Sequence, residues 1–445
     1  MISSLPDSQA LSISASLDAL AGTKPPAMRH FRLPNGLSVY LYEDHDTAQV
    51  AVQLWCHVGA SHEPPGHSNL SHLLEHLLFK GSSKVPAEHF SRVIARLGGM
   101  SNATTHDDAT AFEVTLPAAR LPVALEILAD AMAHATLDQA AFEQEVKTVD
   151  DERRLKVDNS PIERAYDQHR ALAHGDNAYA SLRFGQSIDL AQMSLESVRT
   201  WYRTWYQPNN ATLVVAGDVT VHRLRQAVTT YFATLPPASL RIPPAPRHAA
   251  ELDERSQQLT EPGLRPGLFM SFNVPSLATA TSLETALALH LISDLLGSGF
   301  SALLYSRLVR DRQILKFPNL SYESQLRGDA LLTLSAYTAP GISPQDAAAE
   351  VWSIIDGLRS TPLPDALLDR AKLGLLARQV YESGDAVHQA TRIGHAAAAG
   401  LDPLAYETHP GIIRGLCGAT VQQVARDYLC RERLTTTYLL QGVSA

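Results

Sequence analysis

The spacing of apolar and polar positions changes along the chain, and each spacing predicts a different element. Residues 29–42 alternate in the manner of two strands around a Pro-Asn-Gly turn, and a third strand is expected over 49–58. Residues 71–81 form a predicted helix that is apolar on most of its circumference, and a shorter helix is expected at 86–97. A turn followed by strands is expected over 98–114. The sequence therefore predicts mixed helices and strands.

The same order of elements is predicted again after a proline-rich stretch at 235–262. Residues 268–276 are similar to 52–60, and a helix expected over 281–296 takes the place of the helix at 71–81. The expected fold class is α+β, with two homologous α/β sandwich domains, each a mostly antiparallel sheet flanked by helices. The expected organisation is an N-terminal arm at 1–27, a first domain at 28–234, a linker at 235–262 and a metal-free second domain at 263–445.

Composition and charge exclude several classes of protein. The chain has 445 residues, of which 45% are hydrophobic and 19% charged, as in ordinary globular proteins. Its formal net charge of −9 argues against nucleic-acid binding, which needs a basic surface. Its three cysteines have no paired spacing and predict neither a disulfide framework nor a thiolate metal site. Because no signal-peptide pattern or long apolar run occurs, we expect a cytoplasmic protein without a membrane partner.

The predicted helix at 71–81 contains the pattern H-x-x-E-H, formed by His72, Glu75 and His76. Side chains three and four positions apart share one face of a helix, so the two imidazoles and the carboxylate converge. These groups are costly to bury unless a partner satisfies them, and a divalent metal would do so. A lone buried histidine, however, is more often a hydrogen-bonded core residue. A catalytic zinc site takes three protein ligands, so the metal hypothesis predicts one more ligand further along the chain.

A second helix, expected over 142–154, offers candidates for that ligand. Glu145 and Glu152 are seven positions apart, so two helical turns bring them to nearly the same direction. That direction borders the apolar stripe of the helix, so both carboxylates should face inward. The other acidic residues of this segment are expected to face solvent.

These two segments resemble the inverted-motif zinc peptidases, the family of pitrilysin, insulin-degrading enzyme and the mitochondrial processing peptidase. The family pattern is H-x-x-E-H followed, about 75 residues later, by a glutamate; Glu152 lies 152 − 76 = 76 positions beyond His76. The resemblance implies one zinc ion per chain, held by His72, His76 and Glu152. It further implies that Glu75 is the catalytic general base and that Glu145 is a supporting carboxylate for a ligand histidine.

The resemblance also implies where a peptide substrate binds. The family carries G-x-x-N-A-x-T-x-x-x-x-T where this chain has residues 99–110. Asn102, Ala103 and Thr104 are therefore expected on an edge strand that binds the substrate by adding it as a further strand. Arg310, in the second half, occupies the place of an arginine that helps bind substrate in active members.

A departure from the family pattern bears on the partners of this chain. Active members carry a tyrosine seven positions after that arginine, whereas this chain has Phe317, which has no hydroxyl. Losing one oxyanion donor costs about 10²–10³ in rate. Either Tyr322 replaces it, which its spacing disfavours, or a partner chain does. We expect a hetero-dimer with a metal-free homologous subunit that supplies the arginine and tyrosine, and a homodimer is the competing expectation.

The expected function is zinc-dependent endoproteolysis of peptides or small unfolded proteins, carried out as the catalytic subunit of a dimer. One alternative is a peptidase dedicated to a modified precursor peptide in natural-product or cofactor maturation. Another is a zinc-binding but catalytically idle scaffold subunit, against which the complete ligand set argues.

Overall fold

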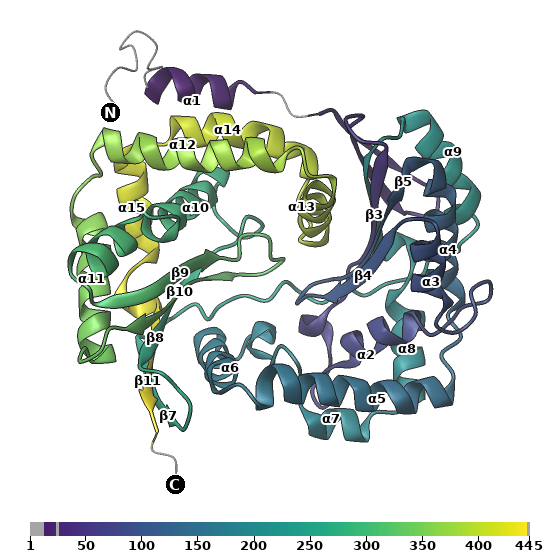
Figure 1. Ribbon diagram of the computed structural model, residues 1–445, viewed down its shortest axis with the longest axis horizontal. Coiled ribbons are helices and arrows are strands. Elements are labelled where there is room, and N and C mark those ends of the chain that lie inside the picture. Colours follow the sequence, from purple (N-terminus) through teal and green to yellow (C-terminus); the bar gives the residue numbers. More distant parts are fainter. Residues whose placement is uncertain (1–12, 24–25, 443–445) are drawn as a thin grey trace, which may run out of the picture.

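Two β-sheets organise the computed structural model, which describes residues 13–23 and 26–442 (Figure 1). The first sheet is built from β1 (Met28–Arg32), β2 (Ser38–Glu43), β3 (Gln49–Cys56), β4 (Met100–Thr105), β5 (Thr110–Pro117) and β6 (Ala211–Gly217). The second sheet is built from β7 (Arg255–Glu261), β8 (Gly267–Val274), β9 (Leu315–Tyr322), β10 (Ala330–Thr338) and β11 (Leu434–Gln441).

The two sheets repeat one connectivity, which confirms the α+β repeat predicted from the sequence. Their strand orders are β1-β2-β6-β3-β5-β4 and β7-β11-β8-β10-β9. The pairs β2–β6 and β7–β11 are parallel, and the other neighbouring strands are antiparallel. The second sheet thus reproduces the first from β2 onward, and β4 and β9 occupy equivalent edges.

Helices cover one face of the first sheet and enclose the first core. Strand side chains alternate between the two faces, and residues such as Val39, Val52 and Leu213 point into this core. The helices of the first half are α2 (Leu70–Leu78), α3 (His89–Arg96), α4 (Leu121–His134), α5 (Gln139–Arg153), α6 (Pro161–His174), α7 (Ser187–Gln192), α8 (Leu195–Trp205) and α9 (Val221–Phe232).

The second half has its own core, in which α10 follows β8 as α2 follows β3. Leu287, Leu291 and Leu295 of α10 pack there against Met270 and Phe272 of β8. The helices of this half are α10 (Leu283–Gly297), α11 (Pro344–Ser360), α12 (Asp365–Glu382), α13 (Ala386–Ala398), α14 (His409–Gly415) and α15 (Gly418–Tyr428).

One helix from each half packs against the sheet of the other half. Helix α13 lies against β3 and β6, where its Ile393 packs beside Tyr42 and Trp55 on the face of the first sheet away from α4 (Figure 1). Helix α6 lies against β7, β8 and β11 of the second sheet, and its Ala165 packs beside Phe269. The two sheets are therefore each covered partly by a helix from the opposite half.

The N-terminal arm and the linker both contain regular structure that the sequence did not indicate. In the arm, α1 (Ile13–Ala21) packs against α12 and α14, and Leu17 joins the second core. The residues expected to form the linker contain no helix or strand as far as 254, but 255–261 form β7, which pairs with β11. The rest of the predicted arm, residues 1–12 and 24–25, lies outside the described residues.

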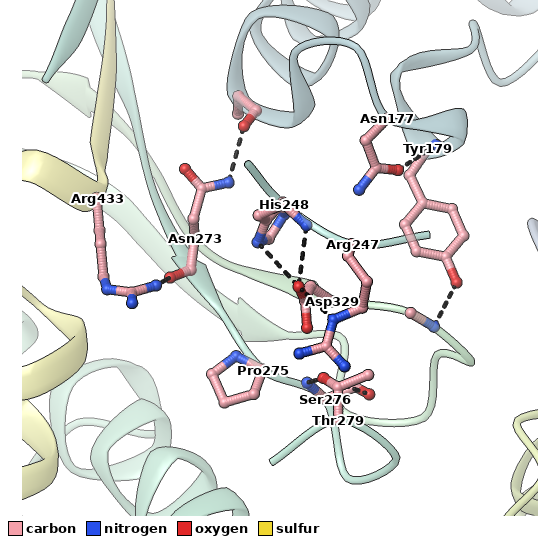
Figure 2. Close-up of polar contacts among 12 residues, drawn as sticks. Asn177, Tyr179, Arg247, His248, Asn273, Pro275, Ser276, Thr279, Asp329 and Arg433 are labelled. Atoms are coloured by element: carbon pink, nitrogen blue, oxygen red, sulfur yellow. Dashed lines mark hydrogen bonds and ion pairs between the residues drawn. The ribbon is translucent and has the colours of Figure 1, made fainter. Parts of the chain in front are cut away.

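Polar contacts fasten the linker to the second half (Figure 2). The Asp329 carboxylate accepts hydrogen bonds from Arg247 Nε (3.1 Å) and from the backbone N of His248 (2.9 Å). Nearby, Gly328 N donates to the Tyr179 hydroxyl (2.8 Å). That hydroxyl in turn donates to Asp108 Oδ2 (2.5 Å). These bonds dock the turn between β9 and β10 onto the first half.

No helix within residues 13–23 and 26–442 is both long and apolar enough to cross a membrane.

Candidate metal centre

Helix α2 presents its polar residues away from the first core. Leu73, Leu74 and Leu77 are fully buried beneath the sheet, which fixes the rotation of the helix. With that side buried, His72 and His76 face α5, and their rings lie 4.8 Å apart at nearly a right angle.

A carboxylate from the preceding loop anchors the start of this helix. Glu63 accepts hydrogen bonds from the backbone N of Asn69 (2.9 Å) and from that of Ser71 (2.7 Å). The first backbone N–H groups of a helix have no partner within the helix, and an acceptor there stabilises it. Glu63 was not singled out from the sequence, because nothing in its spacing shows that the loop folds back on the helix.

Both candidate ligand histidines face one carboxylate oxygen of α5. His72 Nε2 lies 3.5 Å from Glu152 Oε2, and His76 Nε2 lies 3.6 Å from the same oxygen. Glu152 stands in the last turn of α5, directly before a π-helical turn over Arg154–Asp158. Such turns are frequent at functional sites, where they re-aim side chains.

These three donors fit a zinc ion. Zinc bonds to histidine nitrogen and carboxylate oxygen measure about 2.0–2.2 Å, so tetrahedral ligands stand about 3.3–3.5 Å apart. The separations of 3.5 and 3.6 Å match that geometry closely. The ligand atoms of His72, Glu75 and His76 also lie within 4.8 Å of one another, but one oxygen of Glu75 is engaged elsewhere. Glu152 is therefore the better third donor.

Burial and neighbouring groups keep His72 and Glu152 in the protonation states that a metal needs. Burial, and then the neighbouring His76, lower the pKa of His72 to about 4, so this imidazole is neutral at pH 7. Burial acts to raise the pKa of Glu152, but the hydrogen bond from Lys156 and the interactions with His72, Lys156 and His76 outweigh it and lower the pKa overall. Lys156 lies one helical turn after Glu152 and forms an ion pair with its Oε1, the oxygen that does not face the histidines.

Glu145 lies two turns before Glu152 and reaches the second nitrogen of a ligand histidine. Its Oε2 is 2.9 Å from His76 Nδ1, and its Oε1 is 2.9 Å from Lys80 Nζ. Its side chain is only 3% exposed, so both oxygens are satisfied within the protein. A carboxylate on the outer nitrogen fixes which nitrogen of the imidazole faces the metal.

Glu75 lies between the two histidines along α2 and faces β4. Its Oε2 accepts a hydrogen bond of 2.5 Å from the Thr105 hydroxyl. Burial raises the pKa of Glu75, and the Thr105 hydrogen bond acts in the opposite direction. A carboxylate with a raised pKa suits proton transfer near neutral pH. The family pattern has a threonine at position 105, but no role was assigned to Thr105 from the sequence, because only the fold brings β4 across α2.

A cavity of about 860 Å³ opens beside these groups. Asn102, Ala103 and Thr104 line it together with the metal donors, as does Tyr322 from the end of β9. Strand β4 ends the order of the first sheet, so its outer edge pairs with no described strand. An extended peptide can hydrogen-bond to such an edge.

The arginine expected to contact substrate lies outside this cavity. Arg310 is exposed, pairs with Asp311 at 2.9 Å, and is absent from the cavity lining. Phe317 is 80% exposed and has a positive φ of 50°. Tyr322 does line the cavity, but its hydroxyl donates to the carbonyl oxygen of Pro275 (2.6 Å).

A helix-borne H-x-x-E-H, a glutamate from a neighbouring helix and an adjoining edge strand form a candidate metal site of the kind expected in the zinc peptidase class. Two family models match the chain: one described as "Insulinase (Peptidase family M16)" over residues 38–181, and one described as "Peptidase M16 inactive domain" over 192–375. The chain belongs to the M16, or insulinase, family of peptidases.

Relatives of similar length support this assignment. "Zinc protease PqqE" of Helicobacter pylori is 28% identical over 352 residues, which cover 78% of each chain. The crystal structure of a protease from Helicobacter pylori matches with a TM-score of 0.87 and 25% identity, covering 93% of this chain and 99% of that one. "Mitochondrial-processing peptidase subunit beta" of Blastocladiella emersonii is 27% identical over 214 residues, 48% of this chain and 46% of that protein.

Proposed function

We propose that this chain is a zinc-dependent endopeptidase that cleaves extended peptides or small unfolded proteins. The observation that carries the proposal is the approach of His72 Nε2 and His76 Nε2 to a single oxygen of Glu152, at 3.5 and 3.6 Å, on the wall of a cavity with an open strand edge. Zinc would supply, when bound, a Lewis acid that lowers the pKa of a water molecule and polarises the scissile carbonyl.

The side chains around the metal site have separate roles in the proposed reaction. Glu75 takes the proton of the attacking water and returns it to the leaving amine, a role that its position beside the ligands allows. Glu145 acts as a positioning residue through His76, 2.9 Å away. The edge of β4 holds the substrate backbone, and Asn102 is the side chain that we assign to substrate contact.

We further propose that a second subunit completes the site. Arg310 and Phe317 are exposed and do not line the cavity of their own chain, so a donor for the oxyanion would come from a partner that carries both arginine and tyrosine. One relative is by its name the beta subunit of a larger peptidase. A metal-free homologue is the partner that we favour, and a second copy of this chain is the competing one.

The location that we propose for this enzyme is the cytoplasm. The free thiols of Cys56, Cys417 and Cys430 support it, because unpaired cysteines are typical of reducing compartments. Cell fractionation checks this.

The test of the catalytic proposal compares wild type with Glu75→Gln. We measure zinc per chain by elemental mass spectrometry and the release of fragments from unstructured peptides, with and without a co-purified partner. Retained zinc with hydrolysis lost by at least about 10²-fold supports the assignment of Glu75. Zinc-loaded wild type that releases no fragments, alone or with its partner, would make the chain an idle scaffold subunit.

A further inference from the structure

A second cavity, of about 470 Å³, adjoins the metal cavity and has no role in the proposed mechanism. It lies among α10, α12 and α13, next to the chain that leads into β1. Ser324, Gln325 and His395 line both cavities, so they form the partition between them. The Gln325 side chain reaches across this partition, where its Nε2 lies 3.4 Å from the carbonyl oxygen of Arg392 and also contacts the Tyr406 hydroxyl.

One guanidinium in this second cavity lacks an acidic partner. Arg392 donates from Nε (3.1 Å) and Nη2 (2.7 Å) to Gln389 Oε1, and its guanidinium carbon lies 4.5 Å from the centre of the Tyr406 ring. No carboxylate of the described residues forms an ion pair with it, and its Nη1 makes no hydrogen bond with them. Burial lowers the pKa of Arg392, so the group is held where its charge is poorly solvated.

The other arginine of the second cavity already has a carboxylate partner, because Arg378 lies 3.0 Å from Asp294. Two carboxylates also line the cavity, and neither forms an ion pair with Arg392. Glu382 lies 3.3 Å from His388, and its charge acts on Arg392 only at longer range, while Glu407 does not pair with Arg392. Arg392 is thus the unmatched positive charge of the cavity among the described residues. Buried or half-buried guanidinium groups bind carboxylates in a fork geometry, with charge-assisted hydrogen bonds.

The groups around Arg392 leave room for an anion. His409 is buried and neutral, since burial, Arg392 and His290 lower its pKa to about 4. His290 and His409 both line the cavity and can turn an N–H toward a bound oxygen atom. The volume is within the range of sites that take small molecules or parts of peptides.

We propose that the second cavity binds a carboxylate of the peptide substrate through Arg392, with the rest of the peptide passing Gln325 into the metal cavity. This inference rests on the proposed peptidase function. The carboxylate is either the C-terminus of the peptide or an Asp or Glu side chain, since both offer the same two oxygens to a guanidinium.

The test measures binding to the zinc-loaded full chain carrying Glu75→Gln, so that no turnover interferes. The probes are four unstructured decapeptides of Ala, Gly and Ser with one Glu or Gln, each with a free or an amidated C-terminus. Isothermal titration calorimetry should show about 10–100-fold tighter binding for at least one carboxylate-bearing peptide than for the peptide without one. Comparing the two peptides that carry a single carboxylate shows whether the gain in affinity comes from the C-terminus or from the Glu side chain.

Variants then locate the effect. Arg392→Gln in the same background should abolish the preference, and Arg392→Lys, which keeps the charge but not the fork, should reduce it several-fold. Arg370→Gln on α12, an exposed arginine outside this cavity, is the matched control and should keep the preference. Thermal melting shows whether each variant is folded. If Arg392→Gln is not folded, the affinity of Arg392→Lys for the four peptides decides the test.

Equal affinity for all four peptides, or no binding of any, overturns the proposal. So does a preference that survives Arg392→Gln in a folded chain. Hydrolysis of the same peptides by the wild type, alone and with its co-purified partner, is scored separately and tests the proposed function. Hydrolysis without carboxylate preference rejects only the second-cavity assignment, whereas preferential binding without hydrolysis rejects only the peptidase.

Discussion

His76 joins two glutamates of α5, because its Nδ1 lies 2.9 Å from Glu145 Oε2 while its Nε2 lies 3.6 Å from Glu152 Oε2. The imidazole therefore cannot rotate to present its other nitrogen without breaking the bond to Glu145. This single contact makes the orientation of one proposed metal ligand depend on a glutamate outside the proposed ligand set.

Glu145→Gln should weaken zinc binding by about 10–100-fold, because an amide holds the ligand histidine less strongly and makes it less basic. Competition with a chromophoric chelator measures the affinity. Glu143→Gln, on the exposed side of the same helix, is the matched control. Unchanged zinc affinity in Glu145→Gln would show that His76 is oriented by its packing alone.

Thr105→Val should shift the acidic limb of the pH–rate profile to higher pH. The Thr105 hydroxyl lowers the pKa of Glu75 against the larger effect of burial, so removing it raises that pKa further. Glu75 must be ionised to accept a proton, and activity then appears only at higher pH. We expect the acidic limb of kcat/KM against pH to move to higher pH, with the rate above it little changed. Thr105→Ser, which keeps the hydroxyl, should restore the wild-type profile.

Gly394→Ala should destabilise the contact between α13 and the first sheet. A Cβ at this position would lie 2.0 Å from Trp55 Nε1, so the helix would have to move away from β3. The free energy of unfolding, measured in urea, should fall by about 1–3 kcal/mol. Gly374→Ala on α12 meets nothing within 4 Å and should instead raise it by about 0.5–1 kcal/mol. Equal effects of the two substitutions would contradict the close packing of α13.

Mixing two inactive variants distinguishes the possible partners. In a homodimer whose Arg310 serves the opposite protomer, Glu75→Gln and Arg310→Gln chains should together restore about a quarter of wild-type hydrolysis, since half of the dimers hold one intact site. No recovery after mixing is expected if Arg310 serves its own chain, or if the partner is a different subunit. Native mass spectrometry of the mixture confirms that hybrid dimers formed.

Local patterns predicted much of the fold and of the side-chain cluster at the candidate metal site. The H-x-x-E-H helix and the seven-residue spacing of Glu145 and Glu152 depend only on helix geometry, and the structure places these side chains together. The repeat was visible because β3 and β8 have similar sequences and each precedes a helix.

Contacts between distant segments could not be predicted in this way. Strand β7 lies in a stretch expected to be linker, because its partner β11 is about 180 residues away. Helix α13 crosses to the first sheet through small residues, Ala390 and Gly394, which carry no periodic signal of their own. The place of Arg310 outside the cavity likewise depends on how the two halves meet.

Because α6 packs on the second sheet and α13 on the first, the two halves should stay together when the backbone between them is cleaved. A protease that cuts the extended stretch before β7 would sever the backbone, yet each fragment would still hold a helix buried on the sheet of the other. The fragments should co-elute at the size of the intact protein until denatured. Either fragment made alone would expose an apolar sheet face to solvent. The fragment with the candidate zinc site would therefore need the other fragment to remain soluble.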